Sequence, residues 1–163
     1  WIPMGPGIPE ADCPSVRSFV VPHDATQTVG YFIEWGGKRF LLRTDAGRMT
    51  EESMEYASMA DVAVIESNYD MDMLLGGTYP QVLKDRISHG IGHLSNDACA
   101  AAIPQFLHPG LRNLFLCHLS GNNNTPSLAY ESARRALAET GVEPGTVALR
   151  VLRRAEPSPL LNL

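Results

Sequence analysis

Five side chains that could bind a metal ion or move a proton fall at the ends of predicted strands or, in one case, in a loop before a predicted helix: His23, Asp45, Glu66, His93 and His118. Strand ends and loops on a rigid scaffold are where proteins place reactive groups. Imidazoles and a carboxylate suit Zn²⁺, Mn²⁺ or Fe²⁺ in a site with open positions. Spacing alone leaves ordinary roles open, since a single histidine is commonly a surface residue and Asp45 could form a turn.

The segments that must position these side chains alternate in character along the chain. Strands are predicted at residues 16–22, 29–35, 38–44, 62–66, 114–117 and 146–152. Helices are predicted at residues 50–59, 70–75, 80–88, from a cap at 95 or 96 to 107, and at 127–140, with Pro104 as a kink or early stop. Three strands come first and strands then alternate with helices, which indicates a mixed α/β fold.

Residues 62–66 and 114–117 are continuously apolar, which is typical of strands that are buried on both faces. A layer this apolar normally packs against a second one, and the sequence contains no second set of strands of comparable size. We therefore expect part of the apolar surface to face water and to promote self-association.

Five short blocks surround the candidate side chains: Pro22-His23-Asp24-Ala25, Thr44-Asp45-Ala46-Gly47, Glu66-Ser67-Asn68-Tyr69-Asp70, Gly92-His93-Leu94-Ser95-Asn96 and Cys117-His118-Leu119-Ser120. In order and spacing they resemble metallo-β-lactamase-fold hydrolases, in particular the YycJ/WalJ-like branch. The third and fourth blocks are also similar to two elements of ribonuclease Z. The resemblance extends from about residue 16 to residue 141.

This resemblance implies a metal-dependent phosphodiesterase or nuclease acting on DNA or RNA, with two divalent metals, zinc first and manganese or iron as alternatives. His23 would complete one metal site, His118 the other, and Asp45 would bridge both. A water activated by the two metals would attack phosphorus. Glu66 and His93 are the candidates for proton transfer and contact with the leaving group, so the implied catalytic set is Asp45, Glu66 and His93.

The first signature of that family, His-x-His-x-Asp-His, is absent from the sequence. The expected organisation is an irregular segment over residues 1–15, followed over 16–163 by the C-terminal portion of an αββα sandwich. The chain is therefore expected to be a fragment that is inactive alone. Two alternatives remain: a truncated or partner-dependent binding domain without catalysis, and a thioester or lactam hydrolase of the same superfamily.

The composition limits which substrates and which cellular compartment fit this chemistry. The formal net charge of −5 supplies no broad attraction to a polyanion, although bound metal ions would add positive charge locally. Five arginines at positions 134, 135, 150, 153 and 154 could touch phosphates or simply be solvated. Three cysteines without metal-type spacing are typical of reduced thiols in a cytoplasmic protein, and no apolar run is long enough to span a bilayer.

Overall fold

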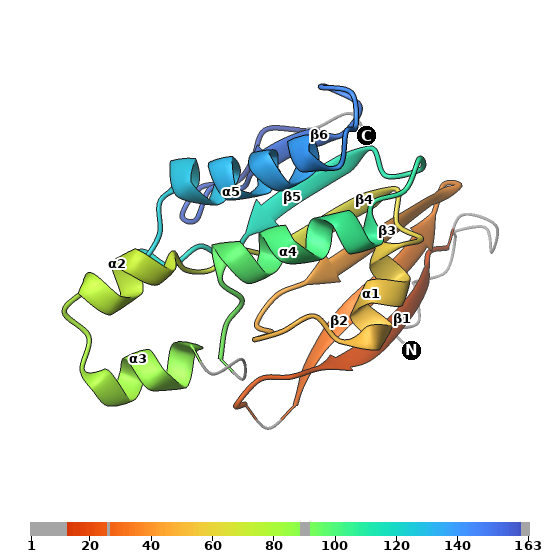
Figure 1. Ribbon diagram of the computed structural model, residues 1–163. Coiled ribbons are helices and arrows are strands. Elements are labelled where there is room, and N and C mark those ends of the chain that lie inside the picture. The colour runs from red at the N-terminus through yellow and green to blue at the C-terminus, as the bar shows by residue number, and fades with distance from the viewer. Residues whose placement is uncertain (1–12, 26, 89–91, 161–163) are drawn as a thin grey trace.

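The computed structural model describes residues 13–25, 27–88 and 92–160 (Figure 1). Most of the predicted irregular segment 1–15 lies outside these residues. All six predicted strands are present, in one sheet whose order follows the chain: β1 (Ser15–Val21), β2 (Thr28–Trp35), β3 (Lys38–Arg43), β4 (Val62–Glu66), β5 (Asn113–Cys117) and β6 (Ala148–Val151). The mixed α/β prediction is confirmed.

The strand pairing of the sheet changes from antiparallel to parallel at β3. Strands β1, β2 and β3 pair antiparallel, whereas β3, β4, β5 and β6 pair parallel. Gly36 and Gly37 close the β2–β3 hairpin with φ angles of 58° and 74°, which glycine adopts without strain. Because parallel strands end at the same edge of a sheet, the residues after β3, β4 and β5 meet along one line.

Over the residues that the structure describes, five helices connect the strands: α1 (Glu51–Ala57), α2 (Met71–Gly76), α3 (Gln81–Ser88), α4 (Asn96–Phe106) and α5 (Pro126–Glu139). Side-chain oxygens of Thr50, Ser95 and Thr125 accept the first free backbone N–H groups of α1, α4 and α5. Pro104 does not stop α4 early, because it lies in the last turn. Within the described ranges, none of the helices is long and apolar enough to cross a membrane.

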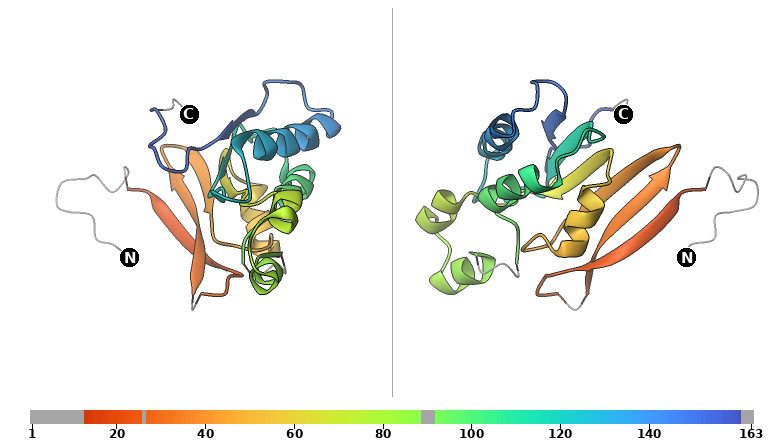
Figure 2. Two further views of the ribbon diagram at one scale, coloured as in Figure 1. Left: turned by 90° about the vertical axis from the view of Figure 1, so that its left-hand side faces the viewer. Right: turned by 45° about the vertical axis from the view of Figure 1, so that its right-hand side comes forward.

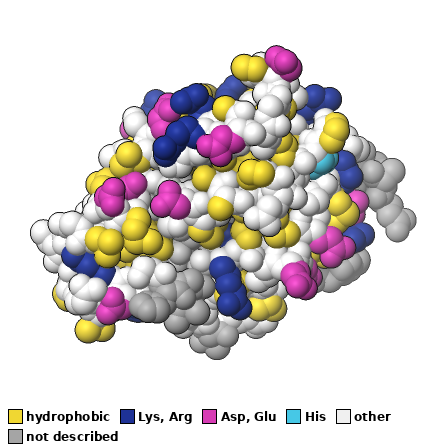
Figure 3. All heavy atoms as spheres, viewed as in Figure 1, with side chains coloured by type: hydrophobic (Ala, Val, Ile, Leu, Met, Phe, Trp, Pro, Cys, Tyr) yellow, Lys and Arg dark blue, Asp and Glu magenta, His cyan; other side chains and the backbone are white. Residues whose placement is uncertain are grey.

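Helices α1, α4 and α5 lie on one face of the sheet (Figure 2). Phe32, Leu41, Ile65 and Leu114 point into this interface and have at most 2% of their surface exposed. Burying each such side chain contributes about 1.5–3 kcal/mol, so this layer holds the sheet edge in place. On the outer surface of the helical face, charges of both signs are interspersed with apolar side chains (Figure 3).

The other face of the sheet carries exposed apolar side chains on β1, β2 and β3. The pairs Val16–Ile33, Val20–Val29 and Tyr31–Leu42 share this face, as does Trp35. Val16, Val20 and Trp35 are 53%, 62% and 59% exposed. Exposed apolar surface was expected, but on the central strands; β4 and β5 are instead mostly buried, and the exposure falls on the antiparallel half of the sheet.

We expect this outer face to make the isolated chain bind a hydrophobic dye and self-associate. Replacing Val16 and Val20 by threonine should lower dye fluorescence and shift sedimentation toward monomer, because it removes apolar groups without disturbing strand propensity. Val82→Thr is the matched control, since Val82 is 82% exposed on α3 and away from the sheet. A monodisperse wild-type monomer without dye binding would contradict this expectation.

Candidate metal centre

The five predicted side chains converge at one end of the sheet. Asp45, Glu66 and His118 come from the ends of the parallel strands β3, β4 and β5. His23 comes from the loop after β1, and His93 from the loop before α4. All except the buried Glu66 line one cavity of about 650 Å³.

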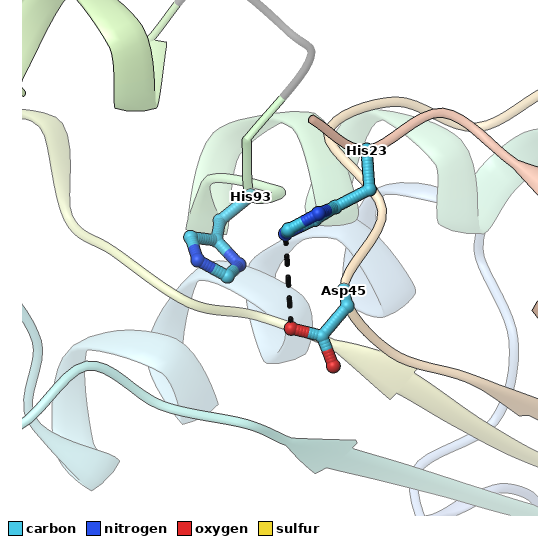
Figure 4. A group of neighbouring side chains, drawn as sticks. All are labelled: His23, Asp45 and His93. Carbon is cyan, nitrogen blue, oxygen red and sulfur yellow. Dashed lines mark ion pairs between the residues drawn. The ribbon is translucent and has the colours of Figure 1, made fainter. Parts of the chain in front are cut away.

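Asp45 lies between two of the histidines. One of its carboxylate oxygens, Oδ1, is 3.9 Å from Nε2 of His23 and 3.7 Å from Nε2 of His118. Figure 4 shows the Asp45 carboxylate facing the His23 ring, with His93 opposite. The ring centre of His93 is 5.4 Å from that of His23 and 5.3 Å from that of His118. The carboxylate predicted to bridge two metals therefore stands between the imidazoles predicted to complete them.

Glu66 is the buried hub of the cluster. Its Oε1 accepts hydrogen bonds from Nδ1 of His93 at 2.7 Å and from Nδ1 of His118 at 2.9 Å. Its other oxygen, Oε2, accepts the backbone N–H of Ala46 at 2.9 Å. Glu66 has no exposed surface, so the contact with a leaving group that the sequence predicted for it is not available. It contacts the two imidazoles instead.

The charge state of the Glu66 carboxylate follows from its contacts. Burial raises the pKa of Glu66, but hydrogen bonds from His118, His93 and Ala46 outweigh burial and lower the pKa from 4.5 to about 2. The same bond to Glu66 raises the pKa of His118, against the opposing effect of burial. The carboxylate therefore stays ionised at neutral pH and holds each Nδ1 proton, which turns each Nε2 toward the cavity.

Two of the site residues have strained backbones. Asp45 and His118 have φ angles of 51° and 55°, in the left-handed region that residues with a side chain seldom adopt. Asn68 stabilises the backbone at His118, because its side-chain amide donates to the carbonyl of His118 at 2.6 Å. Its own carbonyl accepts the N–H of Ser120 at 2.7 Å. These two bonds hold the turn at His118 in place.

Arg43, the last residue of β3, was not identified from the sequence as part of the site. It is 0% exposed, and its Nη2 donates to the carbonyls of Ala46 (3.2 Å) and Arg48. Its Nε and Nη1 have no hydrogen-bond partner in the described part of the chain. Burial lowers the pKa of Arg43 to about 10, while the charge of Glu66 opposes this. A buried cation thus fastens the turn that carries Asp45.

The loop after β5 is fixed by a buried amide network. Asn124 Nδ2 donates to the carbonyls of Ser67 and Asn68 at 2.9 and 3.0 Å, and Asn96 Nδ2 donates to Asn124 Oδ1 at 2.9 Å. Ser67 Oγ in turn donates to Asn96 Oδ1 at 2.7 Å. Asn124 therefore fixes the loop that follows His118. This network ties the ends of β4 and β5 to the start of α4.

The donor atoms fit a divalent metal of borderline softness. His23, Asp45 and His93 offer one group of ligand atoms that lie within 4.8 Å of one another. The atoms of Glu66, His93 and His118 form a second such group, but there the Nδ1 atoms are already bonded to Glu66. Two imidazole nitrogens and a carboxylate oxygen facing one cavity suit Zn²⁺, Mn²⁺ or Fe²⁺.

The two buried cysteines are not part of this donor set. Cys117 lines the cavity next to His118, but burial raises the pKa of its thiol to about 12. Cys99 in α4 is buried, and burial raises its pKa to about 12 as well. Both are protonated thiols at neutral pH, and metals bind the thiolate.

Comparison with known proteins gives relatives of two kinds. No family model matches the chain. Exodeoxyribonuclease YycJ of Bacillus anthracis is 34% identical over 126 residues, which cover 77% of this chain and 48% of the relative. Exodeoxyribonuclease WalJ of Streptococcus pneumoniae is 35% identical over 130 residues, which cover 80% of this chain and 48% of the relative. The chain thus spans about half the length of the curated relatives that it matches.

Two solved structures share the arrangement of strands and helices. The metallo-β-lactamase fold protein YhfI from Bacillus subtilis superposes with a TM-score of 0.60 at 11% identity, over 94% of this chain and 52% of that one. Zn²⁺-bound PqqB from Methylobacterium extorquens also has a TM-score of 0.60, at 25% identity, over 92% of this chain and 50% of that one. The predicted fold is confirmed.

Proposed function

This chain has a metallo-β-lactamase fold and is homologous to the YycJ and WalJ exodeoxyribonucleases over about four fifths of its length, and from this premise we propose that it carries part of the metal site of a DNA-hydrolysing phosphodiesterase. His23 and His118 would hold the metals with their imidazoles, and the Asp45 carboxylate would serve both. The observation that supports this most is the position of Asp45 Oδ1, 3.9 and 3.7 Å from Nε2 of the two histidines.

The metals, when bound, supply Lewis acidity that activates water and neutralises charge on a phosphoryl group. The chain itself supplies the positions of the ligands. Glu66 keeps the Nδ1 proton of His118 in place, so that Nε2 presents its lone pair to the cavity. Nδ1 of His23 has two polar neighbours. The Asp24 carboxylate, at 3.1 Å, can accept a proton from it, whereas the N–H of Ala25, at 3.0 Å, can donate to its lone pair. With Nδ1 protonated toward Asp24, His23 presents Nε2 to Asp45.

His93 is the residue that we assign to proton transfer. Its Nδ1 is fixed by Glu66 at 2.7 Å, and its side chain is partly exposed to the cavity. When both ring nitrogens are protonated, Nε2 can donate to a phosphate oxygen or to the departing alkoxide. Glu66, which has no exposed surface, is a positioning residue for both imidazoles. The buried carboxylate thus orients a metal ligand and a proton donor together.

The ligand set of this chain is small for two metals. His23, Asp45 and His118 give each metal one imidazole and a shared carboxylate, well short of a closed four-ligand site. We therefore expect the purified chain to hold zinc weakly and below one equivalent, and to show no steady hydrolysis of bis(p-nitrophenyl) phosphate. Elemental analysis after dialysis checks this, and two tightly held metals per chain would contradict it.

The activity itself is tested in the assembled enzyme, by which we mean a protein that carries this chain together with a His-x-His-x-Asp-His segment. We expect it to release nucleotides from one end of an oligodeoxynucleotide in the presence of zinc or manganese. His118→Ala should abolish release, whereas His108→Ala should not, because His108 bonds the carbonyl of Ala60 away from the cavity. Hydrolysis of a thioester or lactam without hydrolysis of DNA would overturn the proposal.

A further inference from the structure

Two arginines from the segment after β6 line the same cavity as the metal ligands. Arg153 and Arg154 stand in its wall together with residues 120–123, the loop that follows His118. Among the lining residues that the structure describes, these two are the only lysines or arginines, and Asp45 is the only carboxylate. In a chain of net charge −5, this wall is where a phosphate chain would find a fixed positive charge.

The two arginines differ in how far they are free to bind an anion. Arg153 forms an ion pair with Glu156, three residues further on. Arg154 has no carboxylate partner among residues 13–25, 27–88 and 92–160. Arg154 lines the cavity together with His118 and contacts Gly121 in the loop that follows His118.

Gly121 shows how closely Arg154 packs against the loop. A Cβ atom added at Gly121 would lie 1.7 Å from Nη1 and 2.8 Å from Cζ of Arg154. No side chain fits at such distances, so a residue other than glycine would force the guanidinium to move. The backbone of Gly121 is not in the left-handed region, and the atoms that a Cβ would meet belong to the flexible end of Arg154, so a side chain here would displace the guanidinium rather than strain the loop.

Resting on the proposed function, we propose that Arg154 binds the phosphate of the DNA strand next to the one that is cleaved, with Gly121 providing the space in which its guanidinium lies. A guanidinium pairs with two phosphate oxygens at once, which fixes both the position and the direction of the strand. The metal site formed by residues such as Asp45 and His118 would hold the reacting phosphate, and Arg154 sets which neighbouring phosphate accompanies it. Arg154 is thereby a specificity residue for a strand over a mononucleotide.

The test measures binding rather than turnover, so it can use the chain itself, with excess zinc in the buffer because the chain is expected to hold zinc weakly. A fluorescent single-stranded oligodeoxynucleotide is titrated with the chain at several salt concentrations. We expect Arg154→Ala to weaken binding about 5- to 20-fold and to reduce the slope of log K against log salt by about 0.7, the loss of one phosphate contact to a single strand. Arg150→Ala is the matched control and should change binding less than about twofold, because Arg150 is an exposed residue of β6 that does not line the cavity.

Two further variants separate the charge from the geometry. Gly121→Ala should cause most of the loss of oligonucleotide affinity that Arg154→Ala causes. The double variant should bind little more weakly than Arg154→Ala alone, because both substitutions remove the same contact. Arg154→Lys should recover the salt slope but only part of the affinity, since an ammonium does not pair with two oxygens. Circular dichroism melting of each variant checks that the fold is intact.

A competition arm identifies which phosphate is bound. Thymidine monophosphate and inorganic phosphate should compete weakly and equally well with the wild type and with Arg154→Ala. Competition by either that depends on Arg154 would overturn the assignment to a neighbouring phosphate of a strand. Wild-type binding that Arg154→Ala leaves unchanged, in affinity and in slope, contradicts this inference alone. No oligonucleotide binding by the wild type contradicts the proposed function, and the inference with it.

Discussion

Asp45→Asn is expected to remove metal and activity together from the assembled enzyme, each by at least about 100-fold. Loss of an outer-shell partner of a metal ligand already costs 10- to 100-fold in affinity or activity, and Asp45 is proposed as a direct ligand of both metals. Asparagine is the informative replacement. It keeps the shape of the side chain and tolerates the φ angle of 51°, so only the charge is lost.

Metal content by elemental analysis and the rate of nucleotide release are measured for the same preparation. Asp97→Asn serves as the control, because Asp97 is an exposed acid in the first turn of α4 and does not line the cavity. A folded Asp45→Asn enzyme that keeps both metals would remove Asp45 from the ligand set. Loss of metal in Asp97→Asn as well would point to a nonspecific effect of charge.

His93→Ala should separate chemistry from metal binding. We expect kcat to fall about 10²- to 10⁴-fold, the usual range for loss of acid–base assistance, with metal content near that of the wild type. An unchanged kcat in a folded, metal-replete His93→Ala enzyme would remove the proton-transfer role. Loss of metal would instead assign His93 to the ligands, a role open to it through its group with His23 and Asp45.

Glu66→Gln is expected to differ from His93→Ala. On the sequence alone the two variants should behave alike, because Glu66 and His93 form a pair. In the structure Glu66 bonds Nδ1 of both His93 and His118. The amide would lose the charge that holds both protons, so metal affinity should fall about 10- to 100-fold along with kcat. Their double variant should be little worse than Glu66→Gln, since the residues act as a unit.

The placement of the strands and of the site could be predicted because both follow from local pattern. Parallel apolar strands end at one edge, so residues that follow them, such as Asp45 and His118, had to meet there. Glu66 and His93 were both candidates for proton transfer, and in the structure they form a hydrogen bond. That Glu66 also bonds His118 could not be read from sequence, because it depends on side-chain direction at a buried position.

Two other features gave no signal in the sequence. Arg43 is one basic residue at the end of an alternating strand, where arginine is ordinarily solvated, and nothing local indicates that it is buried. The exposed apolar face was expected on the strands with the longest apolar runs. Those strands lie in the middle of the sheet, where packing covers them, whereas Val16 and Val20 belong to the edge strand β1.

The central claim is that His23 and His118 hold metal through Nε2 while Glu66 keeps the proton of His118 on Nδ1. Nitrogen-15 NMR of the imidazoles during a zinc titration of the chain tests it most directly. We predict that the Nε2 resonances of His23 and His118 shift with zinc, that Nδ1 of His118 stays protonated, and that His108 does not respond. Zinc that shifts His108 or no histidine, with Nε2 of His23 and His118 unchanged, would contradict the account.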